Sequence, residues 1–204
     1  ALLVRGEAFL IDLRIRYPVE AGVGAAVAEM LARRSGDALY IDHDPVRGRA
    51  LAQEVLTLLA DNPRHDAETA RLYAVALQAI GDSYGWEDNY QEARTAHQNA
   101  ERFIAELPDE LREAQGVRNV RSANLRLLGE AHHKMGEEDA ARAALARAVE
   151  INRTLVAEDP DSPTLIRKLT ASLWYSAVLH RSNGRDALAL AAIAPQCNNA
   201  GKCR

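Results

Sequence analysis

The sequence has few aromatic residues and no long apolar run. Phe, Trp and Tyr together make up 5% of its 204 residues. No apolar stretch approaches the roughly 18 residues that indicate a membrane span. The first residues also lack the basic-then-apolar pattern and small-residue cleavage site of a secretory signal. We therefore expect a chain that does not insert directly into a membrane.

Cysteine is scarce as well, since only Cys197 and Cys203 occur, both in the closing segment CNNAGKCR. They could close a small disulfide loop in an oxidising compartment, but two free thiols fit the sequence equally well. The expected location is accordingly the cytoplasm or, if this disulfide forms, the periplasm or another extracytoplasmic space. A metal site here would need two further ligands, and none is expected.

Neither sign of charge is in large excess. The chain has 25 Lys and Arg against 29 Asp and Glu, a formal net charge of −4, with 48% hydrophobic residues. This composition is ordinary for a soluble domain that buries a core. It lacks the basic excess that drives non-specific binding to DNA or RNA, so we expect no nucleic-acid partner.

Motifs for catalysis and for cofactor binding are missing. The sequence has no serine nucleophile elbow, no HExxH and no phosphate-binding loop. Gly22 and Gly24 form half of a dinucleotide fingerprint, but Val27 stands where the third glycine belongs and no βαβ unit follows. We expect neither an enzyme nor a resident cofactor.

Two groups of polar residues contain side chains of the kinds that bind metals. The Asp-His-Asp segment at 42–44 could ligate a cation on a loop, yet Asp44 before Pro45 has the form of a helix cap. His132 and His133 are adjacent on an expected helix, so their side chains point about 100° apart and cannot converge on one ion. No metal site is predicted.

An internal repeat with a period of 48 residues organises the chain. Small residues recur at this spacing within an apolar helical pattern, at Gly81, Gly129 and Ala177. The other aligned sets are Leu77, Leu125 and Leu173; Tyr84, His132 and His180; Asp88, Gly136 and Gly184; Ala93, Ala141 and Ala189; Ala100 and Ala148.

Each copy has the pattern of two helices joined by a short turn. Glycine in a helix interior is unfavourable by roughly 1 kcal/mol relative to alanine. Tiny residues such as Gly129 and Ala141 would allow two helix axes to approach to about 8 Å, which offsets that cost. The pattern predicts that the second helix of each copy packs against the glycine or alanine of the first.

These residues resemble the tetratricopeptide repeat, a helix–turn–helix unit with Gly or Ala at its eighth position and Ala at its twentieth and twenty-seventh. Gly81, Ala93 and Ala100 match all three positions, as does the next copy, whereas the third copy matches the first two. The usual period is 34, so each repeat here has 14 more residues, roughly 20 Å of additional helix. The resemblance covers residues 66–194 well and 20–65 poorly. Long-helix repeats of this kind look like the repeat regions attached to bacterial signalling proteins such as serine/threonine kinases.

The resemblance implies an all-α fold in which helical hairpins stack into a short right-handed superhelical solenoid. We predict one or more degenerate N-terminal hairpins in residues 1–65, repeats of about 48 residues in 66–194, and a flexible cysteine-containing tail in 195–204. Within the first region, the segments GVGAAVAEMLARR and DPVRGRALAQEVLTLLADNP are the expected helices. Residues 1–18 fit a helix or a strand, and a helix is favoured.

The resemblance also implies a non-catalytic scaffold that binds a peptide or partner protein on its concave face. Three rows of residues would line that face: Gln78, Arg126 and Trp174; Asp82 and Glu130, continuing at Val178; His133 and Arg181. Their carboxylates, guanidinium groups and aromatic ring suit an extended or helical peptide of mixed charge. In the alternative interpretation of Trp174, it is a core residue near the terminal repeat.

Two other classes of function stay open at this stage. The chain could be a regulatory or sensory segment of a larger signalling enzyme, which would bind a small molecule or its own catalytic domain. It could also be a self-assembling structural module, for example a homodimer formed through the N-terminal hairpin or the apolar segment ALALAAIAP.

Overall fold

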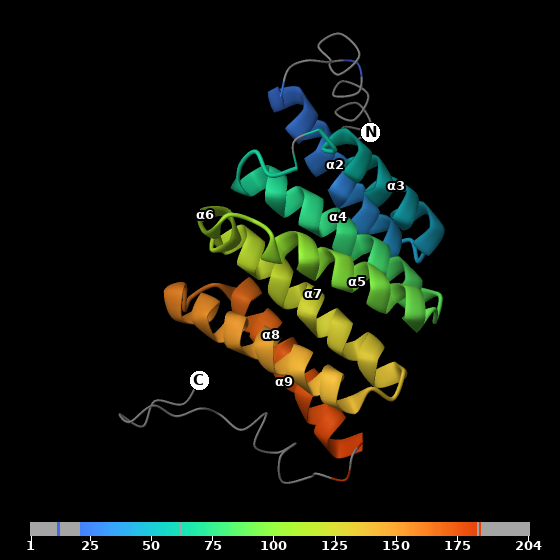
Figure 1. Ribbon diagram of the computed structural model, residues 1–204, viewed down its shortest axis with the longest axis vertical. Coiled ribbons are helices and arrows are strands. Elements are labelled where there is room, and N and C mark those ends of the chain that lie inside the picture. The colour runs from blue at the N-terminus through green and yellow to red at the C-terminus, as the bar shows by residue number, and fades with distance from the viewer. Residues whose placement is uncertain (1–11, 13–20, 62, 183, 185–204) are drawn as a thin grey trace. The chain divides into compact units, whose positions relative to one another are not determined.

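Helices account for all the regular secondary structure in the described part of the chain (Figure 1). The computed structural model describes residues 12, 21–61, 63–182 and 184. The helices are α2 (Ala21–Tyr40), α3 (Pro45–Leu58), α4 (Ala67–Trp86), α5 (Tyr90–Ala105), α6 (Asp109–Arg112), α7 (Gln115–Lys134), α8 (Glu138–Glu158) and α9 (Pro163–Ser182). The prediction of an all-α protein is confirmed.

Local capping determines where several helices begin. The Asp44 side chain accepts a hydrogen bond from the backbone N–H of Arg47 at 2.9 Å, with proline in the first turn of α3. Asp66 accepts one from the N–H of Thr69 at 2.7 Å at the start of α4. These carboxylates satisfy backbone donors that have no partner inside the helix. The helix start predicted at Asp44 and Pro45 is confirmed, and α9 likewise begins at a proline, Pro163.

The 48-residue period is visible in the positions of the helices. The helices α4, α7 and α9 begin 48 residues apart, at Ala67, Gln115 and Pro163, and α5 and α8 begin 48 apart, at Tyr90 and Glu138. The helices predicted for the first two copies, and the first helix of the third, are therefore present. The expected second helix of the third copy, DALALAAI, lies outside the described residues.

The turn after each first helix has the same backbone conformation in all three copies. Asp88, Gly136 and Gly184 have φ values of 56°, 76° and 67°. This left-handed conformation is accessible to glycine without penalty and is tolerated by aspartate better than by most residues. The alignment of Asp88 with the two glycines thus reflects one shared way of ending a helix.

The predicted N-terminal hairpin is formed by α2 and α3, and α2 is longer than its sequence pattern suggested. It continues past Arg34 to Tyr40, because Ala38 and Leu39 extend the buried face. The Ser35 hydroxyl donates to the buried carbonyl oxygen of Gly48 on α3 at 2.8 Å. Residues 1–11 and 13–18, where a helix was favoured, lie outside the described residues.

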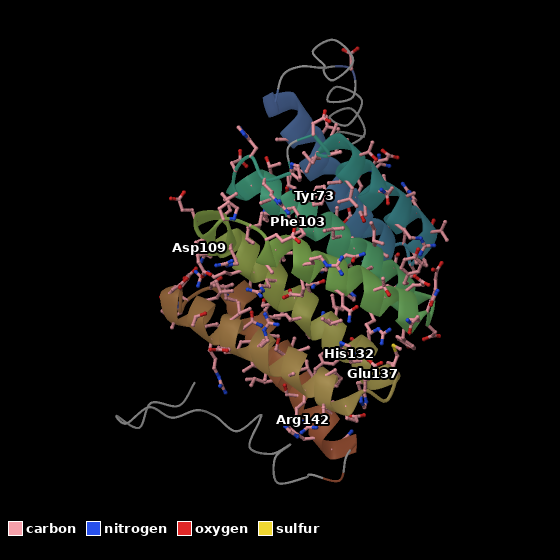
Figure 2. The ribbon with its side chains drawn as sticks, viewed as in Figure 1. Tyr73, Phe103, Asp109, His132, Glu137 and Arg142 are labelled. Carbon is pink, nitrogen blue, oxygen red and sulfur yellow. The ribbon has the colours of Figure 1, made fainter. Side chains whose placement is uncertain are left out.

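The chain divides into two compact units, Ala1–Asn124 and Leu125–Arg204, with the division inside α7. One core of the first unit involves α2, α3 and α4, and another involves α4, α5 and the first half of α7. In the latter, the Tyr73 and Phe103 rings lie 4.7 Å apart between centroids (Figure 2). The sequence-based boundaries at residues 66 and 195 follow the repeat and stay a prediction.

Candidate functional site

Two predicted site residues are neighbours in the second unit. Arg126 and Glu130 lie one turn apart on α7, where side chains four residues apart share a helix face, and their charged groups are 3.7 Å apart. The Arg126 guanidinium also lies over the ring of Tyr175 on α9, at 4.9 Å from its centroid. A cation over an aromatic face is attracted by the ring's quadrupole. We call Arg126, Glu130, Trp174 and Tyr175 the α7–α9 cluster.

Trp174 extends this cluster into solvent. Its ring meets that of Tyr175 edge to face, with centroids 4.9 Å apart and planes at 86°. Tyr175 is partly buried and packs against the core around Leu179, whereas Trp174 is 55% exposed. Trp174 is therefore not a core residue, which decides against the alternative interpretation of this position.

Charges of both signs act on the cluster and its neighbour Lys168. Burial and then the neighbouring charges of Arg167 and Arg126 lower the pKa of Lys168. Burial and like charges both disfavour the charged form of an ammonium group. Burial and then the Glu130 carboxylate raise the pKa of the Tyr175 hydroxyl, which consequently stays protonated and able to donate a hydrogen bond.

His133 and Arg181, the third predicted row, occupy other parts of the unit. The Nδ1 atom of His133 lies 2.9 Å from a carboxylate oxygen of Glu138, the first residue of α8. Arg181 is exposed in the last turn of α9. The preceding His132 has its own carboxylate partner, Glu137, at 2.5 Å (Figure 2), in keeping with the prediction that the two histidines point to different faces.

Gln78 and Asp82 belong to the first unit. Gln78 is half-buried on α4. Asp82 is only 5% exposed, and its carboxylate accepts a hydrogen bond from the Tyr40 hydroxyl of α2. Within this unit, Asp82 therefore joins α4 to α2.

Sequence reasoning missed Tyr175 and Lys168. In the 48-residue alignment, Tyr175 corresponds to Leu127 and Ala79, so no polar or aromatic pattern marks its position. Only the packing of α9 places its ring beneath the Arg126 guanidinium. The partly buried ammonium of Lys168 likewise has no signal in the sequence.

The other sequence features lead to no further site. Asp44 caps α3 and Asp42 pairs with Arg47 at 3.3 Å, and no group of three potential metal ligands occurs among the described residues. None of the described helices is both long and apolar enough to cross a membrane. Cys197 and Cys203 lie outside the described residues, so the disulfide stays a prediction.

Comparison with known proteins supports the fold. No family model matches the chain, and no curated protein matches it. The crystal structure of BtubC (BKLC) from P. vanneervenii is similar, with a TM-score of 0.69 and 14% sequence identity. The similarity covers 98% of this chain and 74% of that one. At this identity it shows that the two chains share a helical, repeat-like fold.

Proposed function

We propose that this protein is a non-catalytic interaction module that binds a peptide segment of a partner protein through the α7–α9 cluster. The observation that carries the proposal is the exposure of Trp174 beside a guanidinium group and a tyrosine ring. Tryptophan, tyrosine and arginine are the residue types enriched where binding energy is concentrated in protein interfaces.

The geometry of Arg126 indicates which group it would bind. Its contact with Glu130, at 3.7 Å, is longer than a hydrogen bond, so its N–H groups are only loosely engaged by that carboxylate. A guanidinium group can make two parallel hydrogen bonds to a carboxylate of the partner. We accordingly propose a segment with an Asp, a Glu or a free C-terminus, flanked by an apolar side chain that packs on Trp174.

The helical-repeat fold supports this role. In stacked helical hairpins, the repeated first helices create an extended concave binding surface. The helices α7 and α9 are first helices in the 48-residue register, and both carry the proposed contacts. We propose a tetratricopeptide-like solenoid arrangement on the same basis.

The proposal is tested by capture of partners from a lysate of the source organism, followed by calorimetry with the captured protein. Trp174→Ala and Arg126→Ala are each expected to weaken binding by about 1–3 kcal/mol. Arg126→Lys should weaken it as well, because an ammonium group cannot form the paired contact. Circular dichroism establishes that each variant is folded.

The matched control is Arg153→Ala, which removes an exposed arginine from α8. It is expected to leave the affinity unchanged. Equal affinities for the Arg126→Ala and Arg153→Ala proteins would rule out the α7–α9 cluster as the binding site. Light scattering identifies the case in which the captured partner is a second copy of this chain.

A further inference from the structure

A second exposed aromatic surface lies in the first unit, where α2 joins α3 and α4 ends. We call it the aromatic rim, and it consists of Tyr40, Ile41, His43, Val46 and Trp86. The Trp86 ring lies 6.3 Å from that of Tyr40 and 5.4 Å from that of His43, between centroids. Among the described residues, six large hydrophobic side chains are exposed, and four of them belong to this rim. Such a concentration is typical of an interaction surface.

Contacts behind the rim hold it in place. The Tyr40 hydroxyl donates to the buried Asp82 carboxylate. Arg49 donates to Glu87 at 2.7 Å, and its guanidinium lies 4.4 Å from the centroid of the Tyr84 ring. These contacts tie α2 and α3 to the end of α4, the helix that ends in Trp86. A surface ordered in advance loses little conformational entropy when it binds a ligand.

The chain segments that carry the rim are acidic. The segments 37–50 and 82–90 contain six carboxylates and two arginines, an excess of four that equals the net charge of −4 of the whole chain. The remaining residues are therefore balanced in charge. Five of these carboxylates are exposed, as is Arg47, which pairs with Asp42, whereas Arg49 is partly buried by its contacts. The exposed carboxylates are Asp37, Asp42, Asp44, Glu87 and Asp88.

We propose that the aromatic rim binds a basic segment of a partner protein, distinct from the segment bound by the α7–α9 cluster. An arginine or lysine of that segment would lie against the Trp86 ring, since indole is the most favourable aromatic face for a cation. An apolar neighbour would cover Ile41, which is 69% exposed. The exposed carboxylates attract such a segment and repel an acidic one.

The positions of the two tryptophans make this proposal directly testable. Trp86 and Trp174 are the only tryptophans in the chain, and one belongs to each candidate surface. In the Trp174→Phe protein, tryptophan fluorescence comes only from Trp86 on the rim. In the Trp86→Phe protein, it comes only from Trp174 in the α7–α9 cluster. The probes are a synthetic peptide of alternating arginine and leucine, and a matched peptide of alternating glutamate and leucine.

We expect the arginine peptide to change the Trp86 emission of the Trp174→Phe protein in a saturable manner. Its affinity should fall as salt is added, because ions screen exposed charges. The glutamate peptide should bind at least about tenfold more weakly, the difference that roughly 1.4 kcal/mol of charge discrimination produces. A Trp86 emission that does not respond, or equal binding of the two peptides, overturns the proposal.

Two exposed isoleucines provide the matched variants. Ile41→Ser on the rim should weaken the arginine peptide at least about fivefold. Ile166 on α9 is 45% exposed, and Ile166→Ser should leave the affinity for the arginine peptide unchanged. Equal losses of affinity in the Ile41→Ser and Ile166→Ser proteins also overturn the proposal. So does an arginine peptide that changes the Trp174 emission of the Trp86→Phe protein but not the Trp86 emission of the Trp174→Phe protein. Arg126→Ala should not alter this titration, so failure here and failure of the proposed function are distinguishable.

Discussion

The imidazole ring of His97 on α5 covers Gly81 on α4, and a Cβ atom at position 81 would lie 2.5 Å from the ring's Cε1 atom. The next copy repeats this relationship, since Leu145 Cγ would be 2.8 Å from a Cβ at Gly129. In each hairpin, therefore, the second helix packs where the first has no side chain. Close packing offsets the poor helix propensity of glycine.

Replacement of Gly81 by alanine should destabilise the protein, although alanine is the better helix former. The added methyl group overpacks the contact, which typically costs about 1–3 kcal/mol. The control is Gly36→Ala in α2, where an added Cβ meets nothing within 4 Å and the change should stabilise by up to about 1 kcal/mol. Urea denaturation measures both, and a Gly81→Ala protein as stable as the control would contradict the packing.

Gly129→Leu should lower the melting temperature by several degrees. An added Cβ would lie 3.2 Å from the backbone carbonyl oxygen of Ala141 and would also contact Leu145. The backbone of α8 cannot shift without disturbing the helix. About 1–3 kcal/mol of overpacking corresponds to a fall of roughly 2–4 °C per kcal/mol in a chain of this size. Gly85→Leu, at a position with open space, is the comparison, and equal melting temperatures would argue against the contact.

Asn124→Ala should reduce the free energy of unfolding by about 1–3 kcal/mol. The Asn124 side chain joins α7 to α5, because its Oδ1 lies 2.8 Å from His97 Nδ1 and its Nδ2 donates to the His97 carbonyl at 3.0 Å. Truncation leaves these buried polar groups without that partner. Gln53→Ala, at an exposed position of α3, should change stability by less than about 0.5 kcal/mol. Similar losses in the two proteins would show that the buried contact contributes little.

Asp66→Ala should destabilise the protein by about 0.5–2 kcal/mol at neutral pH, because it removes the cap of α4. The hydrogen bond from the Thr69 N–H holds the pKa of Asp66 below its usual value near 3.9. The ionised form is thus favoured by folding, and its stabilisation is present above the usual pKa and lost as the pH falls through the lower folded value.

The difference in stability between wild type and Asp66→Ala should accordingly shrink on acidification below about pH 4. Denaturation at neutral and acidic pH measures it. The control is Asp161→Ala, at an exposed loop position, which should change stability by less than about 0.5 kcal/mol at neutral pH. A difference that grows in acid would contradict the assigned role of the carboxylate.

Much of the fold was predictable because it depends on residues close together in the chain. The cap at Asp44, the proline at the start of α9 and the small residues at Gly81 and Gly129 are local or periodic signals. Helix boundaries follow from such signals because a cap satisfies backbone groups only a few residues away. Asp88 aligns with two glycines in the repeat, and the structure gives all three a positive φ.

The candidate site was predictable only in part. The repeat register placed Arg126 and Glu130 on one face of a helix, as the structure has them. The same register gave no reason to single out Tyr175, and it assigned Asp82 to a binding row although its carboxylate accepts a bond from Tyr40. A register identifies equivalent positions, but each position has different neighbours in each copy.

The sequence by itself therefore determined the helices, their period and the points where two helices approach closely, because propensity, capping and side-chain size act locally. The tertiary structure alone decided that Trp174 is exposed and that the Tyr175 ring lies under Arg126. It also decided that the Trp86 ring lies beside those of Tyr40 and His43. Tyr40 and Asp82 are 42 residues apart in the chain, and such pairs meet only when the helices between them have packed. Each candidate binding surface depends on a contact of this kind, Arg126 with Tyr175 in one and Tyr40 with Trp86 in the other.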